Sequence, residues 1–297
     1  MLNLFQQRDF GTKINATFQY ITQNFRSLGL ALLYIVGPLA LLTGIASGIV
    51  QSNMLATIGS ATAQTDPSDP LAGLRMLQNI FSPAYWIALF FGLITALAVN
   101  LVTYAHMKLY AEKNGADSTV GEIWEATQPL IGRGLIITVL GTIITVVAMF
   151  FFLIPGIYVA VVLSLSLVVT TFEGTDFSQT WNRCFKLIRD KWWSTFGLIF
   201  IVAIISGILG LIFNIPAGVV GFLVAAKLLP SASTLWLVLT TIISSVGGTM
   251  LRAMICVALA FQYTNLVERQ EGRGLISAID SIGTTPTKPR LDDEGDY

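Results

Sequence analysis

Arg252 is the residue of this 297-residue chain that most directly suggests binding chemistry, because it is the one charged residue within the long apolar segments. An arginine at the centre of a bilayer costs at least about 2.5–3.5 kcal/mol on insertion scales, which makes it a candidate functional group. No aspartate or glutamate lies in those segments to pair with it. The guanidinium could therefore bind a lipid phosphate, another anion or free backbone carbonyls, with the amides of Asn100 and Asn214 as candidate helpers.

A structural interpretation of Arg252 stays open beside the functional one. Its segment, 236–266, is longer than one membrane crossing requires. Arg252 could therefore lie nearer one face of the membrane and extend its charged group to the lipid headgroups along its aliphatic stem. The sequence does not decide between the two interpretations.

Other reactive groups are few and scattered. The chain has one histidine, His106, and two cysteines, Cys184 and Cys256, in different segments. The sequence contains no Walker A motif, no H-E-x-x-H and no cysteine cluster with zinc spacing. We therefore predict a protein that is not an enzyme and uses no cofactor or metal. A net charge of zero gives no basic field that would indicate nucleic-acid binding.

The elements that must position these residues are membrane-spanning helices. The segment 134–172 carries no charged side chain over 39 residues, a length of roughly 58 Å as one helix. A hydrocarbon core is only ~30 Å thick, so this segment is suited to two crossings. Pro155 and Gly156 lie at its midpoint, which predicts a helical hairpin that turns there.

The whole chain predicts an all-α, polytopic membrane protein. It is 54% hydrophobic and 11% charged, against about 25% charged in soluble domains. Residues 1–270 are expected to form one transmembrane domain, and 271–297 a largely disordered cytoplasmic tail. Asn214 and Pro216 are expected to interrupt the fifth crossing, so that 216–229 forms an interfacial or re-entrant helix. The six predicted spans are 28–50, 85–105, 135–153, 157–172, 195–213 and 237–266.

The distribution of lysine and arginine predicts the orientation. Only Arg75 and Lys227 fall on the side opposite the termini, and Arg252 lies inside a span. This asymmetry predicts cytoplasmic N- and C-termini in a cytoplasmic (inner) membrane. The expected cytoplasmic residues are Arg8, Lys13, Arg26, Lys108, Lys113, Arg133, Arg183, Lys186, Arg189, Lys191, Arg269, Arg273, Lys288 and Arg290.

Three similar amphipathic stretches precede the odd-numbered spans and favour a threefold repeat of one interfacial helix and two spans. Their expected N-caps are Asp9, Thr119 and Asp176. Apolar residues recur at helical spacing after each cap, and basic residues such as Arg183 and Lys186 occupy the opposite face of the third stretch. The alternative is that any helix entering a membrane has this pattern.

The chain resembles the YciC-like integral membrane proteins and the related membrane domain of glycerophosphoryl diester phosphodiesterases. The resemblance implies a six-span all-helical fold and little chemistry. In the phosphodiesterases, hydrolysis belongs to a separate soluble domain, and this sequence contains no such domain. The resembling residues are Ile154-Pro155-Gly156-Ile157-Tyr158, Glu173, Phe177, Trp181-Asn182-Arg183, Leu187-Ile188, Trp192-Trp193, Phe196, Phe261-Gln262-Tyr263 and Leu266-Val267-Glu268-Arg269.

These observations predict a non-enzymatic membrane protein that binds lipid or another amphiphile, or that serves as a membrane subunit or scaffold for a partner protein. Basic, tryptophan-bearing interfacial helices suit anionic headgroups, which adds Arg183 and Lys186 to the candidate lipid- or anion-binding residues. The alternative is a transporter for a small amphiphilic solute, which would need an internal polar cavity. Membrane lipids are the expected partners, and the oligomeric state is not predicted.

Overall fold

The computed structural model describes residues 2–63, 81–226, 228–229, 234–272 and 276 as an entirely helical molecule without strands among those residues. The predicted all-α fold is therefore confirmed. Residues 64–80 and nearly all of the predicted tail 271–297 lie outside the described residues. The elements are α1 (Phe10–Gln23), α2 (Phe25–Ala31), the π-helix η1 (Leu32–Val36), α3 (Gly37–Ala63), α5 (Pro83–Glu112), α6 (Val120–Thr127), the 3-10 helix η2 (Gln128–Leu130), α7 (Ile131–Phe151), α8 (Leu153–Leu163), α9 (Ser166–Glu173), α10 (Phe177–Ile188), α11 (Trp192–Ala225) and α12 (Thr234–Glu271).

Six helical segments of the described chain are long and apolar enough to cross a membrane, as the sequence predicts. Each contains the matching predicted span, except that 135–153 extends two residues past the end of α7. The chain is therefore a multi-pass membrane protein. The spans are Phe25–Thr57, Pro83–Glu112, Val120–Phe151, Leu153–Glu173, Trp192–Val224 and Thr234–Glu271.

The hairpin of α7 and α8 forms as predicted, but its break lies earlier than expected. α7 ends at Phe151, and the next residue, Phe152, has an extended backbone with φ −149° and ψ 107°. Pro155 lies in the first turn of α8, where a missing N–H costs no helical hydrogen bond. Gly156 allows close packing: a Cβ there would lie 2.6 Å from Cα of Met149 on α7.

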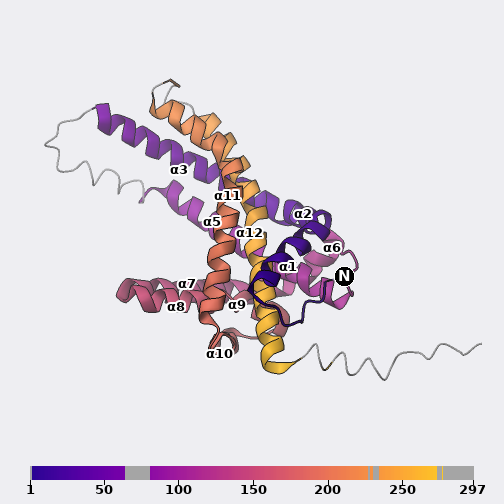
Figure 1. Ribbon diagram of the computed structural model, residues 1–297. Coiled ribbons are helices and arrows are strands. Elements are labelled where there is room, and N and C mark those ends of the chain that lie inside the picture. The colour runs from indigo at the N-terminus through magenta and orange to yellow at the C-terminus, as the bar shows by residue number, and fades with distance from the viewer. Residues whose placement is uncertain (1, 64–80, 227, 230–233, 273–275, 277–297) are drawn as a thin grey trace, which may run out of the picture.

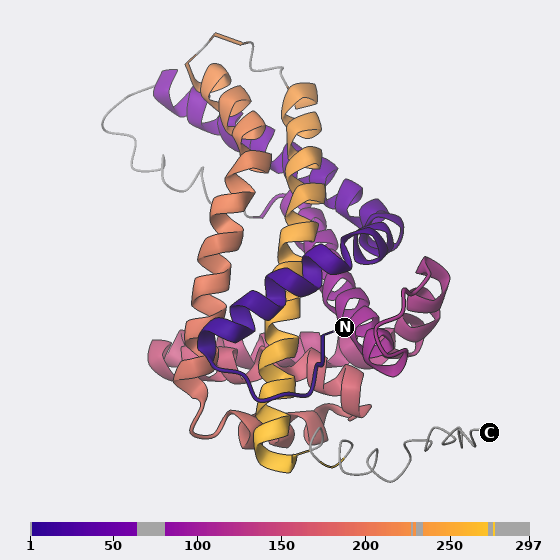
Figure 2. The same ribbon diagram turned by 45° about the vertical axis from the view of Figure 1, so that its right-hand side comes forward.

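The predicted break at Asn214–Pro216 is wrong, because α11 runs through Pro216 to Ala225 as one helix. Its ribbon changes direction in the second half (Figures 1 and 2). Packing against α12 supports the helix here, since Ser244 donates to the carbonyl of Phe213 at 2.7 Å. Membrane helices tolerate proline where neighbouring side chains supply such hydrogen bonds. The described residues of 216–225 therefore belong to the fifth span.

Two glycines of α3 allow this helix to pack closely against α12. A Cβ at Gly44 would lie 2.6 Å from Cα of Ile242, and one at Gly48 would lie 2.6 Å from Cα of Val238. Thr241 donates to the carbonyl of Gly44 at 2.9 Å. The G-x-x-x-G pair is therefore a packing surface for α12.

The three interfacial helices begin at the predicted caps. The Asp9 carboxylate accepts from the N–H of Thr12, and Thr119 and Asp176 each form a capping box. The predicted apolar face is only partly buried, because Trp124 is 40% exposed and Phe25 is 64% exposed. The positions of the three caps thus agree with a threefold repeat. The recurrence of a buried apolar face in each unit remains a prediction.

The protein core lies around the C-terminal half of α12, where α1, α5, α9 and α10 surround it. Tyr20 of α1 bonds His106 of α5 at 2.6 Å, and Ser27 bonds the other ring nitrogen at 2.9 Å. The α7–α8 hairpin leaves this core at a steep angle to α11 and α12 in both views (Figures 1 and 2). A cavity lies at the base of that angle.

Candidate functional site

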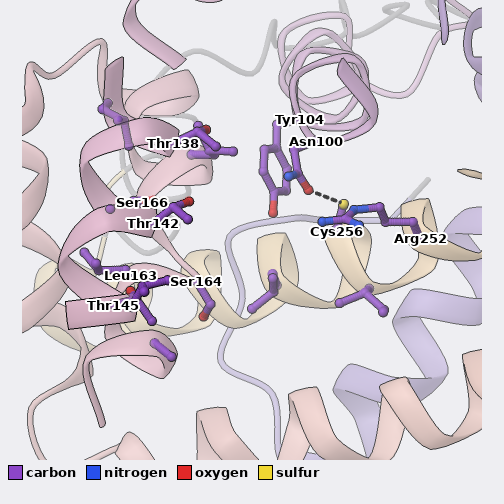
Figure 3. Close-up of a pocket in the computed structure, with 17 residues that line it drawn as sticks. Asn100, Tyr104, Thr138, Thr142, Thr145, Leu163, Ser164, Ser166, Arg252 and Cys256 are labelled. Carbon is purple, nitrogen blue, oxygen red and sulfur yellow. Dashed lines mark hydrogen bonds between the residues drawn. The ribbon is translucent and has the colours of Figure 1, made fainter. Parts of the chain in front are cut away.

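A cavity of about 510 Å³ lies between the α7–α8 hairpin and the pair α5 and α12. Figure 3 shows its polar side chains, with hydroxyls on the hairpin side facing Arg252, Asn100 and Tyr104. This volume is within the usual 300–1,000 Å³ of small-molecule sites. The lining residues are Asn100, Tyr104, Ile137, Thr138, Gly141, Thr142, Thr145, Val146, Ala160, Leu163, Ser164, Ser166, Leu167, Arg252, Ile255, Cys256 and Leu259.

Arg252 lies far from both ends of its helix. It is ten positions, or ~15 Å, from Gln262, which bonds Lys13 of the interfacial helix α1. It is eighteen positions from the start of α12 at Thr234. This spacing favours a guanidinium within the membrane over one that reaches the headgroups. Among the described residues, it makes no hydrogen bond or ion pair.

Asn100 joins Arg252 in the cavity, as the sequence suggested. The Cys256 thiol donates to the Asn100 carbonyl oxygen at 2.8 Å (Figure 3). Because Cys256 follows Arg252 by one helical turn, this bond holds the amide beside the guanidinium. The amide nitrogen has no hydrogen bond within the described part of the chain, so its two N–H donors are available.

Hydroxyl groups form the opposite wall of the cavity. Thr138, Thr142 and Thr145 recur along α7 at helical spacing, and Ser164 and Ser166 flank the break between α8 and α9. The Thr138 hydroxyl is shielded and has no hydrogen-bond partner among the described residues. Sequence reasoning missed these residues, although hydroxyls at positions i, i+4 and i+7 of an apolar helix would have revealed a polar stripe.

Asn214 does not belong to this cavity. Its amide donates to the carbonyl of Gly210, one turn earlier on α11, at 2.8 Å. Such local bonds satisfy an amide side chain in a helix without any ligand. The structure thus brings together two of the five candidate residues, Arg252 and Asn100.

Arg183 lies in a different environment, where carboxylates surround it. Its guanidinium bonds both oxygens of Glu173 at 2.9–3.0 Å and reaches Glu271 at 2.5 Å. Tyr263 also donates to Glu173, at 2.8 Å. Burial lowers the pKa of Arg183, but the bonds to both carboxylates outweigh it, so the pKa is raised overall. We call Arg183, Glu173, Glu271 and Tyr263 the carboxylate cluster.

Lys186 is exposed on α10, and its backbone carbonyl accepts from Gln270 at 3.1 Å. Neither Arg183 nor Lys186 lines the cavity, and their assignment to lipid remains a prediction. Nearby, burial raises the pKa of the Cys184 thiol to about 12, so this cysteine stays protonated and packs as an apolar residue.

No protein-family model, curated protein or solved structure matches this chain. The resemblance to YciC-like proteins therefore remains a prediction from the quoted residues. The cavity must be interpreted from its own chemistry.

Proposed function

We propose that this protein binds an anionic amphiphile in the membrane, with the anionic head of the ligand on Arg252 and its acyl chain between the α7–α8 hairpin and α12. The observation that carries the proposal is a guanidinium deep in a spanning helix, facing a polar cavity, with no counterion among the described residues. Such a charge is costly in lipid unless an anion pairs with it.

The donors around the cavity match a phosphate or carboxylate head. Arginine forms bidentate, charge-assisted hydrogen bonds with either group. The Asn100 amide and the α7 hydroxyls can bond the remaining oxygens or a glycerol hydroxyl. Apolar residues such as Ile255 and Leu259 supply contacts for the first methylenes of a chain. The proposal includes no catalytic step.

We also propose in which membrane the protein lies and to which side its termini face. The asymmetry of basic residues supports cytoplasmic termini in a cytoplasmic membrane, and the resemblance to YciC-like proteins agrees with a non-enzymatic role. Protease mapping of sealed vesicles tests the orientation, since cleavage near Lys113 and Lys186 must occur from the same side.

The experiment compares two ligands that differ only in the phosphate. Lysophosphatidic acid and the monoacylglycerol of equal chain length are titrated against the full chain in phosphatidylcholine nanodiscs. We expect lysophosphatidic acid to bind more tightly, and Arg252→Ala to weaken it about 10–100-fold, as for loss of a charge-assisted hydrogen-bond pair. Arg252→Lys should lose less affinity than Arg252→Ala. Lysine keeps the positive charge but lacks the paired N–H donors with which a guanidinium binds two phosphate oxygens.

Arg189→Ala is the matched control, since it removes an exposed arginine outside the cavity. Equal affinities for both ligands, or equal losses in Arg252→Ala and Arg189→Ala, would contradict the proposal.

The polar cavity also favours a second candidate function, a transporter for a small amphiphilic solute, because transport requires such a cavity. Vesicles that contain the protein distinguish the two. A binding protein leaves labelled lysophosphatidic acid in the leaflet to which it was added, whereas a transporter equilibrates it between leaflets in an Arg252-dependent manner.

A further inference from the structure

A second, smaller pocket lies outside the intramembrane cavity, where the start of α1, the start of α11 and the C-terminal part of α12 meet. Its volume is about 140 Å³. Four basic residues, Arg8, Lys13, Lys191 and Arg269, line it beside a single acidic residue, Asp9. The binding function proposed above does not use any of these residues.

Lys13 lies at the centre of this pocket and is only 3% exposed. Its ammonium group donates to the Gln262 amide oxygen at 2.7 Å and to the Ser194 hydroxyl at 3.3 Å. An ammonium carries three donors, so one is left over. No carboxylate of the described residues lies within ion-pair distance of it. A buried cation without a carboxylate partner is unfavourable unless another anion is supplied.

The remaining basic residues of the pocket add further positive charge, which makes a bound anion more favourable. Lys191 and Arg269 are exposed and form no side-chain hydrogen bond or ion pair within the described ranges. The Arg8 guanidinium instead bonds the carbonyl of Leu4 at 3.0 Å and packs over the Phe261 ring. The Asp9 carboxylate is held by the N–H of Thr12 at 2.8 Å, as the cap of α1.

The start of α11 adds partial positive charge to the pocket. Lys191 is the N-cap of this 34-residue helix, its side chain makes no cap bond, and Ser194 of the first turn lines the pocket. N–H groups of a first helical turn have no partner within the helix and favour anions. A lysine cluster and a helix N-terminus from different parts of the chain therefore converge on one volume.

We propose that this pocket binds a phosphate group, either the headgroup of an anionic lipid or free inorganic phosphate. Lys13, Lys191 and Arg269 supply the charge, and the Ser194 hydroxyl, which accepts from Lys13, can donate its own proton to the phosphate. The volume equals the liquid share of about five water molecules at ~30 Å³ each, which suits a phosphorus with its four oxygens. It is too small for an acyl chain, so a lipid would leave its chains outside.

The electrostatics of Lys13 agree with a site for an anion. Burial lowers the pKa of Lys13 to about 8, with further lowering by Arg269 and Lys191 and partial opposition from Asp9. A bound anion would raise this pKa again, because it favours the charged ammonium. Anion affinity should therefore be highest below pH 8 and fall as the pH rises through that value.

The test uses Lys191→Gln/Arg269→Gln, which removes two exposed charges and leaves Lys13 and the core intact. The control, Arg26→Gln/Arg189→Gln, removes two exposed charges outside the pocket. All proteins carry Arg252→Ala, so that the intramembrane cavity contributes nothing and failure of the two proposals can be distinguished. Equilibrium binding of labelled inorganic phosphate is measured in phosphatidylcholine nanodiscs at constant ionic strength. Retention of phosphatidic acid over phosphatidylcholine is measured by native mass spectrometry.

We expect the pocket variant to bind at least one probe about 10–30-fold more weakly than the control, as for two charges near a headgroup. Loss of lipid retention alone identifies a headgroup site, and loss of phosphate binding alone identifies a soluble anion. Equal binding of both probes by the pocket variant and the control would overturn the proposal, as would the absence of binding in the control.

A pH series gives a second readout. Sulfate keeps a constant charge, so its affinity reports the protein alone. Between pH 7 and 9.5 we expect about a tenfold loss of sulfate affinity as Lys13 deprotonates. A Lys13→Arg variant should keep its affinity over this range, because arginine remains charged. A wild-type affinity that does not change with pH would contradict the role of Lys13.

Discussion

Arg183 and Arg252 are both arginines in contact with the helical bundle, yet their surroundings differ completely. Arg183 is enclosed by the carboxylate cluster, with two carboxylates on one guanidinium. Arg252 faces a cavity of hydroxyl and amide groups and has no counterion among the described residues. The first arrangement ties α9, α10 and the end of α12 together. The second leaves a charge uncompensated inside a spanning helix.

If Arg252 binds a ligand as proposed, the difference separates a charge that stabilises the fold from one that serves a ligand. A guanidinium that pairs with two carboxylates has its charge compensated, so it gains less from a lipid phosphate than an unpaired guanidinium does. A guanidinium without partners in the membrane costs stability, and this cost is explained if a ligand supplies the missing anion.

The largest effect is expected where the carboxylate cluster is broken. Glu173→Gln removes the bidentate partner of Arg183 and leaves a largely buried charge with less compensation, for a loss of about 3 kcal/mol in the free energy of unfolding. Chemical denaturation in detergent micelles measures this loss. Glu125→Gln, at an exposed position, is the control. A change no larger than in the control would show that the carboxylate cluster does not stabilise the fold.

A carboxylate introduced into the cavity would give Arg252 the kind of partner that Arg183 has in the carboxylate cluster. Ile255→Glu places a carboxylate three residues after Arg252, on the wall of the cavity. The new ion pair should occupy the guanidinium and weaken lysophosphatidic acid binding at least about tenfold, with unfolding free energy within about 1 kcal/mol of wild type. Ile255→Gln loses the same apolar contact as Ile255→Glu but adds no charge, so it should bind lysophosphatidic acid more tightly than Ile255→Glu does. Full binding by Ile255→Glu would mean that the ligand does not need Arg252.

A smaller effect is expected at Thr138. Its shielded hydroxyl has no partner among the described residues, so Thr138→Val should leave stability unchanged or raise it slightly. Loss of one neutral hydrogen bond to the ligand should weaken lysophosphatidic acid binding about threefold to tenfold. Calorimetric titration measures this change. Thr12→Val, at an exposed interfacial position, provides the comparison, and equal effects on binding would remove Thr138 from the site.

The six spans and the three helix caps could be predicted from the sequence, because hydropathy and capping are local properties. The position at which α7 ends, just before Phe152, could not be predicted from the sequence. Pro155 is compatible both with a turn between two helices and with the first turn of α8. The continuity of α11 through Pro216 is accompanied by a hydrogen bond from Ser244 of α12 to the Phe213 carbonyl, and such a contact between residues distant in sequence is not a local property.

The candidate site was only partly predictable for a related reason. Asn100 is a candidate from the sequence because its amide lies near a span end, and it lines the same cavity as Arg252. Asn214 was chosen on the same grounds but bonds its own helix. The pairing of Arg183 with Glu173 and Glu271 requires three helices to converge. Composition cannot show such convergence, and neither can the spacing of residues along one helix.

The most direct test of the account is the proximity of a ligand phosphorus to the Arg252 guanidinium. Solid-state NMR can measure the coupling between ³¹P of lysophosphatidic acid and ¹⁵N-labelled arginine side chains in vesicles. The Lys191→Gln/Arg269→Gln background removes the second pocket. We expect a coupling that corresponds to about 4 Å, as in an arginine–phosphate hydrogen bond, present in Arg183→Lys and lost in Arg252→Lys. A coupling that persists in Arg252→Lys would contradict the central claim.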